Sequence, residues 1–174
     1  MALFANEFTN LNDLFVFELK DLYDAEHQIT EALPKMMEAA TNPQLKSAFR
    51  EHLQQTKTHI SRLEQVFSKI GSQPERETCA AMKGLISEGQ DMIRAKGNDS
   101  VRDAGLISAA QRVEHYEMAG YGTVRTLAQQ LGFSEVAQTL QQTLDEEGDT
   151  DKKLTRIAQS AVNMKAPQGE PIHA

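Results

Sequence analysis

The amino-acid sequence predicts an all-α protein, a bundle of four long helices with one short extra helix, and three observations support this prediction. Apolar residues recur at steps of three and four along almost the whole chain, which is the period of a helix with one buried face. Proline is absent from residues 1–33, 44–73 and 75–166, so long uninterrupted helices are permitted. No segment alternates convincingly like a strand, and 174 residues suffice for one domain with a sizeable core.

The first two long helices are predicted to form an antiparallel hairpin. Asn10 is a suitable N-cap for the first helix, whose apolar stripe fades near Ala40. Asn42 and Pro43 then indicate an immediate restart, because asparagine suits the cap and proline suits the first helical position. Gly71 is a natural stop for the second helix.

The second half of the chain predicts a short helix followed by another hairpin. The short helix covers roughly residues 79–95. Ser100, with Asp103 three residues later, resembles a capping box for the third long helix. Residues 132–134 are a very short turn, and Ser134 is expected to cap the fourth long helix.

The predicted order is two antiparallel hairpins joined by a long crossover, and the crossover carries the short helix. This order is the ferritin-like connectivity. An up-down-up-down bundle with a decorated loop is the alternative. We expect the bundle domain to cover residues 1–165 and a disordered tail to cover residues 166–174, where prolines and glycine gather.

Composition excludes several classes of protein. A formal charge of -7 and a pI of about 5.2 argue against binding to nucleic acid, which needs clustered Lys and Arg. The sequence has neither an apolar run of 18 residues nor the features of a signal peptide, so we expect no membrane span and a cytoplasmic location. The single cysteine, Cys79, excludes an intramolecular disulfide and is expected to be a buried, small apolar residue.

Ionisable residues interrupt the apolar stripes of all four long helices. An unpaired carboxylate in a core is costly, and lysine and arginine fall mostly on other faces of these helices. A pair of metal ions would supply the missing positive charge. The residues predicted to ligate metal are Glu26, His59, Glu114, Glu117, Glu147 and Asp151.

The positions of these residues along their helices support a common site. At about 1.5 Å per residue, each lies roughly 21–28 Å from the turn of its own hairpin. Each hairpin therefore brings its polar residues to the middle of the bundle. An oxygen-rich site with histidine suits iron or manganese better than structural zinc. The alternative is a polar core layer satisfied by internal hydrogen bonds and water.

Other polar residues near these positions are given structural roles. His52 is expected to be a core histidine, and Tyr23 and Tyr121 to pack in the core or to hydrogen-bond the ligands. His115 is expected at the surface or beside the ligands. Glu146, Asp149 and Glu88 are expected to be solvated acids.

Several strings of the sequence resemble the YciE/YciF-type bacterial stress proteins over about residues 10–162. The most specific is Ala-Ala-Gln-Arg-Val-Glu-His-Tyr-Glu at 109–117; the others are Asp-Leu-Tyr-Asp-Ala-Glu at 21–26, His-Leu-Gln-Gln-Thr at 52–56 continuing through His59 to Glu64, and Leu-Asp-Glu-Glu at 144–147. The resemblance implies a ferritin-like bundle, commonly a homodimer, with a role in stress responses and no established biochemical activity.

Ferritin-like proteins place single glutamates on the first and third helices and Glu-x-x-His on the second and fourth. The resemblance thus implies that Glu26 and Glu114 match the single glutamates, His59 the second-helix histidine and Glu147 the fourth-helix glutamate. Glu117 matches the extra third-helix glutamate of rubrerythrin-like proteins.

Two residues depart from that pattern. Thr56 stands in place of the second-helix glutamate and Thr150 in place of the fourth-helix histidine, for which Asp151 is a substitute from the next position. Gln55 stands where relatives often carry glutamate, and it is a poorer ligand. Three functions follow as alternatives: a di-iron or di-manganese oxidoreductase or ferroxidase, a non-catalytic stress or binding protein with a degenerate metal site, and metal storage.

Overall fold

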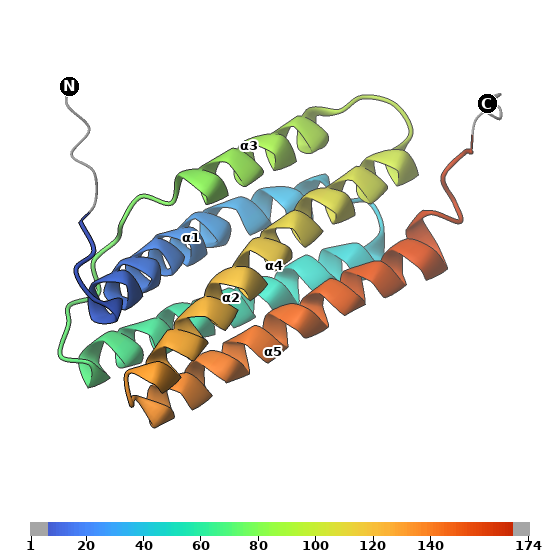
Figure 1. The fold of residues 1–174 in the computed structure, drawn as a ribbon. Helices are drawn as coiled ribbons and strands as arrows, with labels where there is room; N and C mark the ends of the chain where they lie inside the picture. Colours follow the sequence, from blue (N-terminus) through green and yellow to red (C-terminus); the bar gives the residue numbers. More distant parts are fainter. Residues whose placement is uncertain (1–6, 169–174) are drawn as a thin grey trace, which may run out of the picture.

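The structure is a computed structural model that describes residues 7–168, and within this range it contains helices and no strand. The all-α fold class is therefore confirmed. Figure 1 shows the long helices running side by side and the shorter helix, α3, lying along the outside of the bundle. The elements are α1 (Leu11–Ala39), α2 (Pro43–Lys69), α3 (Ala80–Arg94), α4 (Asp99–Gln130), α5 (Ser134–Ile157) and the π-helical turn η1 (Ala158–Val162).

The crossover runs the length of the bundle, as the ferritin-like connectivity requires. The carboxylate of Asp103, in the first turns of α4, accepts hydrogen bonds from the Thr41 and Asn42 backbone N–H groups and from the Thr41 hydroxyl, at 2.7–2.9 Å. Because α4 begins beside the α1–α2 turn, α2 and α4 run in the same direction. The α1–α2 and α4–α5 turns consequently lie at opposite ends of the bundle (Figure 1). The up-down-up-down alternative is wrong.

Two of the four predicted helix caps are confirmed and two are wrong. The Asn10 and Asn42 side chains accept backbone hydrogen bonds at the starts of α1 and α2. Asn98, and not Ser100, caps α4, because the Asn98 side chain accepts from the N–H groups of residues 100 and 101. Ser134 is the first helical residue of α5, and no side-chain bond caps that helix.

Glycine ends two of the long helices, where the backbone takes a left-handed conformation. Gly71 has a φ of 70° and Gly132 a φ of 83°, values that side-chain-bearing residues rarely adopt. Gly71 thus stops α2 as predicted, and Gly132 permits the short α4–α5 turn.

The core divides into two apolar clusters with a polar layer between them. An aromatic cluster packs toward the α4–α5 turn and includes Phe15, Phe67, Tyr121, Val124 and Leu140. A second cluster packs toward the α1–α2 turn and beneath α3. The buried polar residues between the clusters are Glu26, His52, Thr56, His59, Glu114, Glu117, Thr143, Glu147 and Thr150.

Hydrogen bonds fasten the crossover to α1 just before α3 begins. The Asp24 carboxylate accepts from the Cys79 N–H at 2.9 Å, from the Arg76 guanidinium at 2.7 Å and from the Gln28 amide at 2.6 Å. Cys79 is completely buried, which confirms the expectation for this thiol, and its Sγ lies 3.0 Å from the Tyr116 hydroxyl. Most of the predicted disordered tail, residues 169–174, lies outside the described residues.

Candidate metal centre

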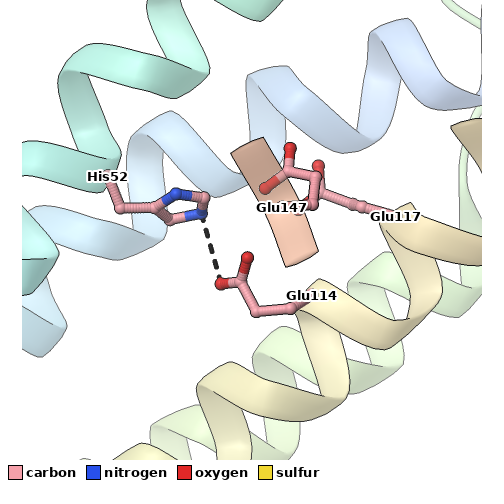
Figure 2. A group of neighbouring side chains, drawn as sticks. All are labelled: His52, Glu114, Glu117 and Glu147. Carbon is pink, nitrogen blue, oxygen red and sulfur yellow. Dashed lines mark ion pairs between the residues drawn. The ribbon is translucent and has the colours of Figure 1, made fainter. Parts of the chain in front are cut away.

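Four buried side chains from three helices converge at the middle of the bundle. His52 of α2, Glu114 and Glu117 of α4, and Glu147 of α5 each offer one ligand atom, and these atoms all lie within 4.8 Å of one another. Figure 2 shows His52 facing Glu114, with Glu117 and Glu147 beside them. All four are buried: His52 is 3% exposed, Glu114 1%, and Glu117 and Glu147 0%.

A second group adjoins the first and shares one residue with it. Glu26 of α1, His59 of α2 and Glu147 of α5 also offer ligand atoms within 4.8 Å of one another. The His59 Nδ1 lies 2.9 Å from the Glu147 Oε1 and 3.3 Å from the Glu26 Oε1. Glu147 therefore stands between two potential ligand groups. A carboxylate in that position has the two oxygens needed to contact a pair of ions.

Most of the polar atoms in the two groups lack a hydrogen-bond partner. Both oxygens of Glu117, both oxygens of Glu147 and both ring nitrogens of His52 are buried without one. The same lack of a hydrogen-bond partner holds for one oxygen of Glu26, one oxygen of Glu114 and the Nδ1 of His59. The His52 Nε2 lies 3.3 Å from the Glu114 Oε1, close enough for an ion pair but not in hydrogen-bonding geometry.

Such groups are costly in a protein core, because an unpaired carboxylate loses its hydration without compensation. Among residues 7–168, no lysine or arginine forms an ion pair with Glu26, Glu114, Glu117 or Glu147. A bound cation pair would satisfy these atoms. The donor set, four carboxylates and two imidazoles, therefore fits the hard or borderline metals predicted from the sequence.

The electrostatics of the layer are those of acids crowded in a dry site. Burial, and next the charge of Glu147, raise the pKa values of Glu114 and Glu117 well above the usual carboxyl value. Burial also raises the pKa of Glu26, against the opposing effect of His59. In the metal-free protein, the environment therefore stabilises the protonated forms of these glutamates relative to a glutamate in water.

Glu147 and the two histidines respond differently. Burial would raise the pKa of Glu147, but His59 and His52 together lower it. Burial would lower the pKa of His59, but Glu147 and Glu26 raise it to about 10. His52 has a lowered pKa, chiefly because it is buried. Glu147 is thus the ionised acid of the layer, with His59 as its principal partner.

A further set of hydrogen bonds orients the group that contains Glu26. The Tyr121 hydroxyl donates to the Glu26 Oε1 at 2.5 Å. The His59 Nε2 lies 2.8 Å from the Glu146 Oε2, and Arg62 donates to both oxygens of Glu146, at 2.7 and 2.8 Å. Glu146 therefore fixes the ring of His59 so that Nδ1 faces Glu26 and Glu147, which is the usual arrangement around a metal-binding histidine.

The structure brings together five of the six residues predicted to bind metal and leaves one apart. Asp151 belongs to neither group. Its Oδ1 accepts from the Gln111 amide at 2.9 Å and lies 3.4 Å from the His115 Nε2, and its side chain is 20% exposed. Since four residues along a helix turn about 400°, Asp151 points some 40° away from Glu147 and toward α4 and the solvent.

His52 is a buried core histidine as expected, and it also lies within reach of Glu114, Glu117 and Glu147, which the sequence did not predict. It lies on the same stripe as His59, about two turns earlier, and that spacing was the available signal. The expectation for Glu146 was wrong. Glu146 was expected to be a solvated acid, yet it binds His59 and Arg62. Tyr121 does bind a predicted ligand, as one of its two suggested roles required.

Thr56 and Thr150 stand where the ferritin-like pattern has a glutamate and a histidine, and both hydrogen-bond within their own helices. The Thr56 hydroxyl donates to the His52 carbonyl at 2.9 Å, and the Thr150 hydroxyl donates to the Glu146 carbonyl at 3.0 Å. Gln55 accepts from Thr150 at 3.5 Å through its side-chain oxygen. These residues therefore shape the wall of the layer and offer it no charge.

Comparison with known proteins identifies the family. The family described as domain of unknown function DUF892 matches residues 10–167. The chain is 47% identical to the protein YciF of Escherichia coli strain K12 over 157 residues, which cover 90% of this chain and 95% of YciF. The chain belongs to the DUF892 family. This DUF892 protein is thus a relative of YciF, as the resemblance in its sequence indicated.

Solved structures confirm the fold of this DUF892 protein. The crystal structure of the E. coli stress protein YciF superposes with a TM-score of 0.87 at 45% identity, covering 91% of this chain and all of that one. The structure of the protein YcfI of Rhodopseudomonas palustris superposes with a TM-score of 0.84 at 40% identity, covering 88% of this chain and 98% of that one.

A more distant structure supports the ferritin-like classification of this DUF892 protein. A two-domain protein of Anabaena variabilis that contains a ferritin-like domain gives a TM-score of 0.61 at 15% identity, covering 95% of this chain and 42% of that one, and so bears on the fold alone. Within the described residues, no helix is both long and apolar enough to cross a membrane.

Proposed function

We propose that this DUF892 protein is a ferritin-like stress-response protein that binds a pair of iron or manganese ions between α1, α2, α4 and α5. The observation that carries the proposal is the sharing of Glu147 by two ligand groups whose buried oxygens and nitrogens otherwise lack partners. The stress-response part of the proposal is supported by the relationship to YciF, which is described as a stress protein.

Each group would hold one ion with its own residues. His52, Glu114 and Glu117 would complete one side, and Glu26 and His59 the other, with Glu147 common to both. Iron or manganese bound there would supply oxidoreductase chemistry of the ferroxidase type toward dioxygen or peroxide. The apolar clusters on either side place the layer in a surrounding of low polarity, which strengthens its electrostatic interactions.

The remaining polar residues have positioning roles. Tyr121 holds one oxygen of Glu26 and leaves the other free. Glu146, paired with Arg62, keeps the Nδ1 of His59 directed inward. A proton displaced from His59 has a route to the surface through Glu146, whose side chain is 32% exposed.

Metal analysis of the full chain tests this proposal. Protein reconstituted with Fe(II) without oxygen, or with Mn(II), should retain a pair of ions per chain, and Glu147→Gln should lose both because both groups use that residue. Glu135→Gln is the matched control, since Glu135 lies on the same helix with an 83% exposed side chain. Wild-type protein that retains no metal under these conditions would contradict the proposal.

A non-catalytic stress or binding protein with a degenerate site is the second candidate. It is favoured by Thr56 and Thr150, which leave the layer with fewer ligands than the Glu-x-x-His pattern supplies. Comparing the rates at which dioxygen and peroxide are consumed by Fe(II)-loaded wild type and by Glu147→Gln separates the candidates, because equal rates would favour the second.

The homodimer and the cytoplasmic location implied by the resemblance, and metal storage in a larger shell, stay predictions. Light scattering on the purified chain distinguishes a dimer from a shell, and fractionation of cells tests the location.

A further inference from the structure

An apolar cavity lies beneath α3 and reaches the polar layer. Its walls come from α1, α3 and α4, and His52 and Glu114 form part of its lining. On the outer side, Lys35, Gln90 and Ile93 line both this cavity and an adjoining surface depression. The cavity thus lies between the surface depression and the ligand group that contains His52.

The lining is almost entirely apolar. Apart from His52, Glu114, Lys35 and Gln90, every lining residue is aliphatic, methionine or glycine. Both ring nitrogens of His52 are buried and lack hydrogen-bond partners. The cavity therefore ends at unsatisfied polar atoms but offers few hydrogen-bonding groups along its length.

A glycine in α3 keeps part of this space open. Gly89 lies inside the helix with an ordinary helical φ, where glycine is less favourable than alanine by about 0.5–1 kcal/mol. A Cβ at this position would meet only the Cβ of Ala109, at an ordinary contact distance of 3.9 Å. Neither backbone conformation nor a close neighbour requires glycine here, and Gly89 lines the cavity.

The size of the cavity limits what it can hold. It leaves about 30 Å³ for the centre of a water-sized molecule. A single water molecule needs roughly 10–15 Å³ by this measure, whereas the engineered apolar cavity that binds benzene measures about 150 Å³. The cavity accommodates a diatomic gas and is too small for an aromatic or acyl substrate.

We propose that this cavity admits dioxygen to the His52 side of the polar layer, so that dioxygen, rather than hydrogen peroxide arriving by the same path, would be the oxidant of two ferrous ions bound there, taking one electron from each. This inference rests on the metal centre proposed above. Dioxygen is apolar and loses little on leaving water, whereas hydrogen peroxide would lose hydrogen bonds that the walls do not replace.

Xenon, which occupies dry apolar cavities in proteins, tests the cavity without any metal. Crystals of the metal-free full chain, pressurised with xenon, should show one xenon site beside Gly89. Gly89→Leu should lose that xenon, because the new side chain fills the space. Gly84→Leu is the matched control on the same helix, at an exposed position where an added Cβ meets nothing. Val113→Phe fills the same cavity from α4 if Gly89→Leu does not fold.

Oxidation rates then test the role of the cavity. In Fe(II)-loaded protein of equal metal content, Gly89→Leu should slow oxidation by dioxygen and leave oxidation by peroxide unchanged, while Gly84→Leu should alter neither. Absence of xenon from the wild-type cavity, or equal slowing with both oxidants, would overturn the inference. Failure of the chain to hold metal would instead overturn the proposed function, since the xenon result does not depend on metal.

Discussion

Two sets of buried carboxylates in this protein differ in how completely they are hydrogen-bonded. Asp24 and Asp103 lie near opposite ends of α3, and each accepts several hydrogen bonds that tie segments of the chain together. Glu114, Glu117 and Glu147 are buried as deeply but keep oxygens with no hydrogen-bond partner, although Glu147 forms an ion pair with His59 at 2.9 Å. Burial alone therefore does not distinguish the two sets; the lack of hydrogen-bond partners does.

The pKa values of Asp24, Glu114 and Glu117 follow the same division. Burial would raise the pKa of Asp24, but the Cys79 N–H, Gln28 and Arg76 together lower it. Burial raises the pKa values of Glu114 and Glu117, and the charge of Glu147 raises them further. The first set stabilises the fold, and the second set is held in place by the packing around it.

Metal binding should produce the largest difference between the sets. Free metal at about 100 times its Kd should raise the free energy of unfolding by about 2.7 kcal/mol, because only the folded chain presents the assembled site. Urea denaturation with and without Mn(II) measures this. Asp24→Asn should keep the metal-dependent increase, whereas Glu147→Gln should lose it; an equal increase in both variants would contradict the division.

Removing a satisfied carboxylate should destabilise the protein. Asp103→Ala should lower the free energy of unfolding by about 2 kcal/mol, because the Thr41 and Asn42 N–H groups lose their acceptor. Asp99→Ala is the control, since Asp99 lies at the start of the same helix with a 65% exposed side chain and should change stability by less than about 0.5 kcal/mol. Denaturant titration at neutral pH measures both variants.

The unsatisfied carboxylates should make the metal-free protein less stable as pH rises. Above pH 4.5, the usual value, unfolded glutamates release protons that Glu26, Glu114 and Glu117 retain in the folded state because their pKa values are raised. The folded state then binds more protons, so each group lowers the free energy of unfolding by up to about 1.4 kcal/mol per pH unit until its folded pKa is reached.

His59 acts in the same direction between pH 6.5 and about 10, because its folded pKa is raised over that interval. The folded-state pKa of Glu147 is lowered, so this residue affects the free energy of unfolding only below about pH 4.5. There it acts in the opposite direction, because the unfolded state binds more protons and stability rises with pH. Unfolding titrations from pH 5 to 9 in the presence of a chelator measure the slope. A slope that is the same in wild type and in Glu117→Met would show that Glu117 does not contribute.

Replacing one unsatisfied carboxylate by an apolar side chain of similar size should have the smallest effect, and of the opposite sign to Asp103→Ala. Glu117→Met should raise the free energy of unfolding of the metal-free protein by about 1 kcal/mol at neutral pH, because a desolvated acid is removed. Differential scanning calorimetry with a chelator present measures it. A loss of stability comparable to that of Asp103→Ala would show that Glu117 has partners like those of the first set.

Much of the fold followed from local chemistry. The helical period placed all five helices, and the asparagines at positions 10 and 42 capped the helices that they were expected to cap. The capping prediction failed at Ser100 because the helix begins two residues earlier, where the Asn98 side chain accepts from the N–H groups of residues 100 and 101. Asp103 was then free to bind the α1–α2 turn, a contact between residues far apart in the sequence.

The site was predicted less completely, because the two hairpins had first to be placed side by side. Distances counted from each hairpin's own turn matched Glu26 with His59 correctly. The two turns lie at opposite ends of the bundle, however, so distances from one turn cannot be compared directly with distances from the other. The Asp103–Thr41 contact gives a common reference point for positions along the two hairpins. Counted from that contact, His52 and Glu114 both lie about ten residues along their helices, and they meet.

The sequence by itself determined the all-helical class, the buried stripes, and the presence of acids and histidine on them, because these properties depend only on residue type and helical period. Only the tertiary structure decided that His52 and not Asp151 joins the layer, that Glu147 stands between two groups, and that a cavity opens under α3. The physical reason is that the rotation and axial offset of each helix are set by the packing of all its neighbours at once, and a shift of 40° or of one turn is enough to exchange one ligand for another.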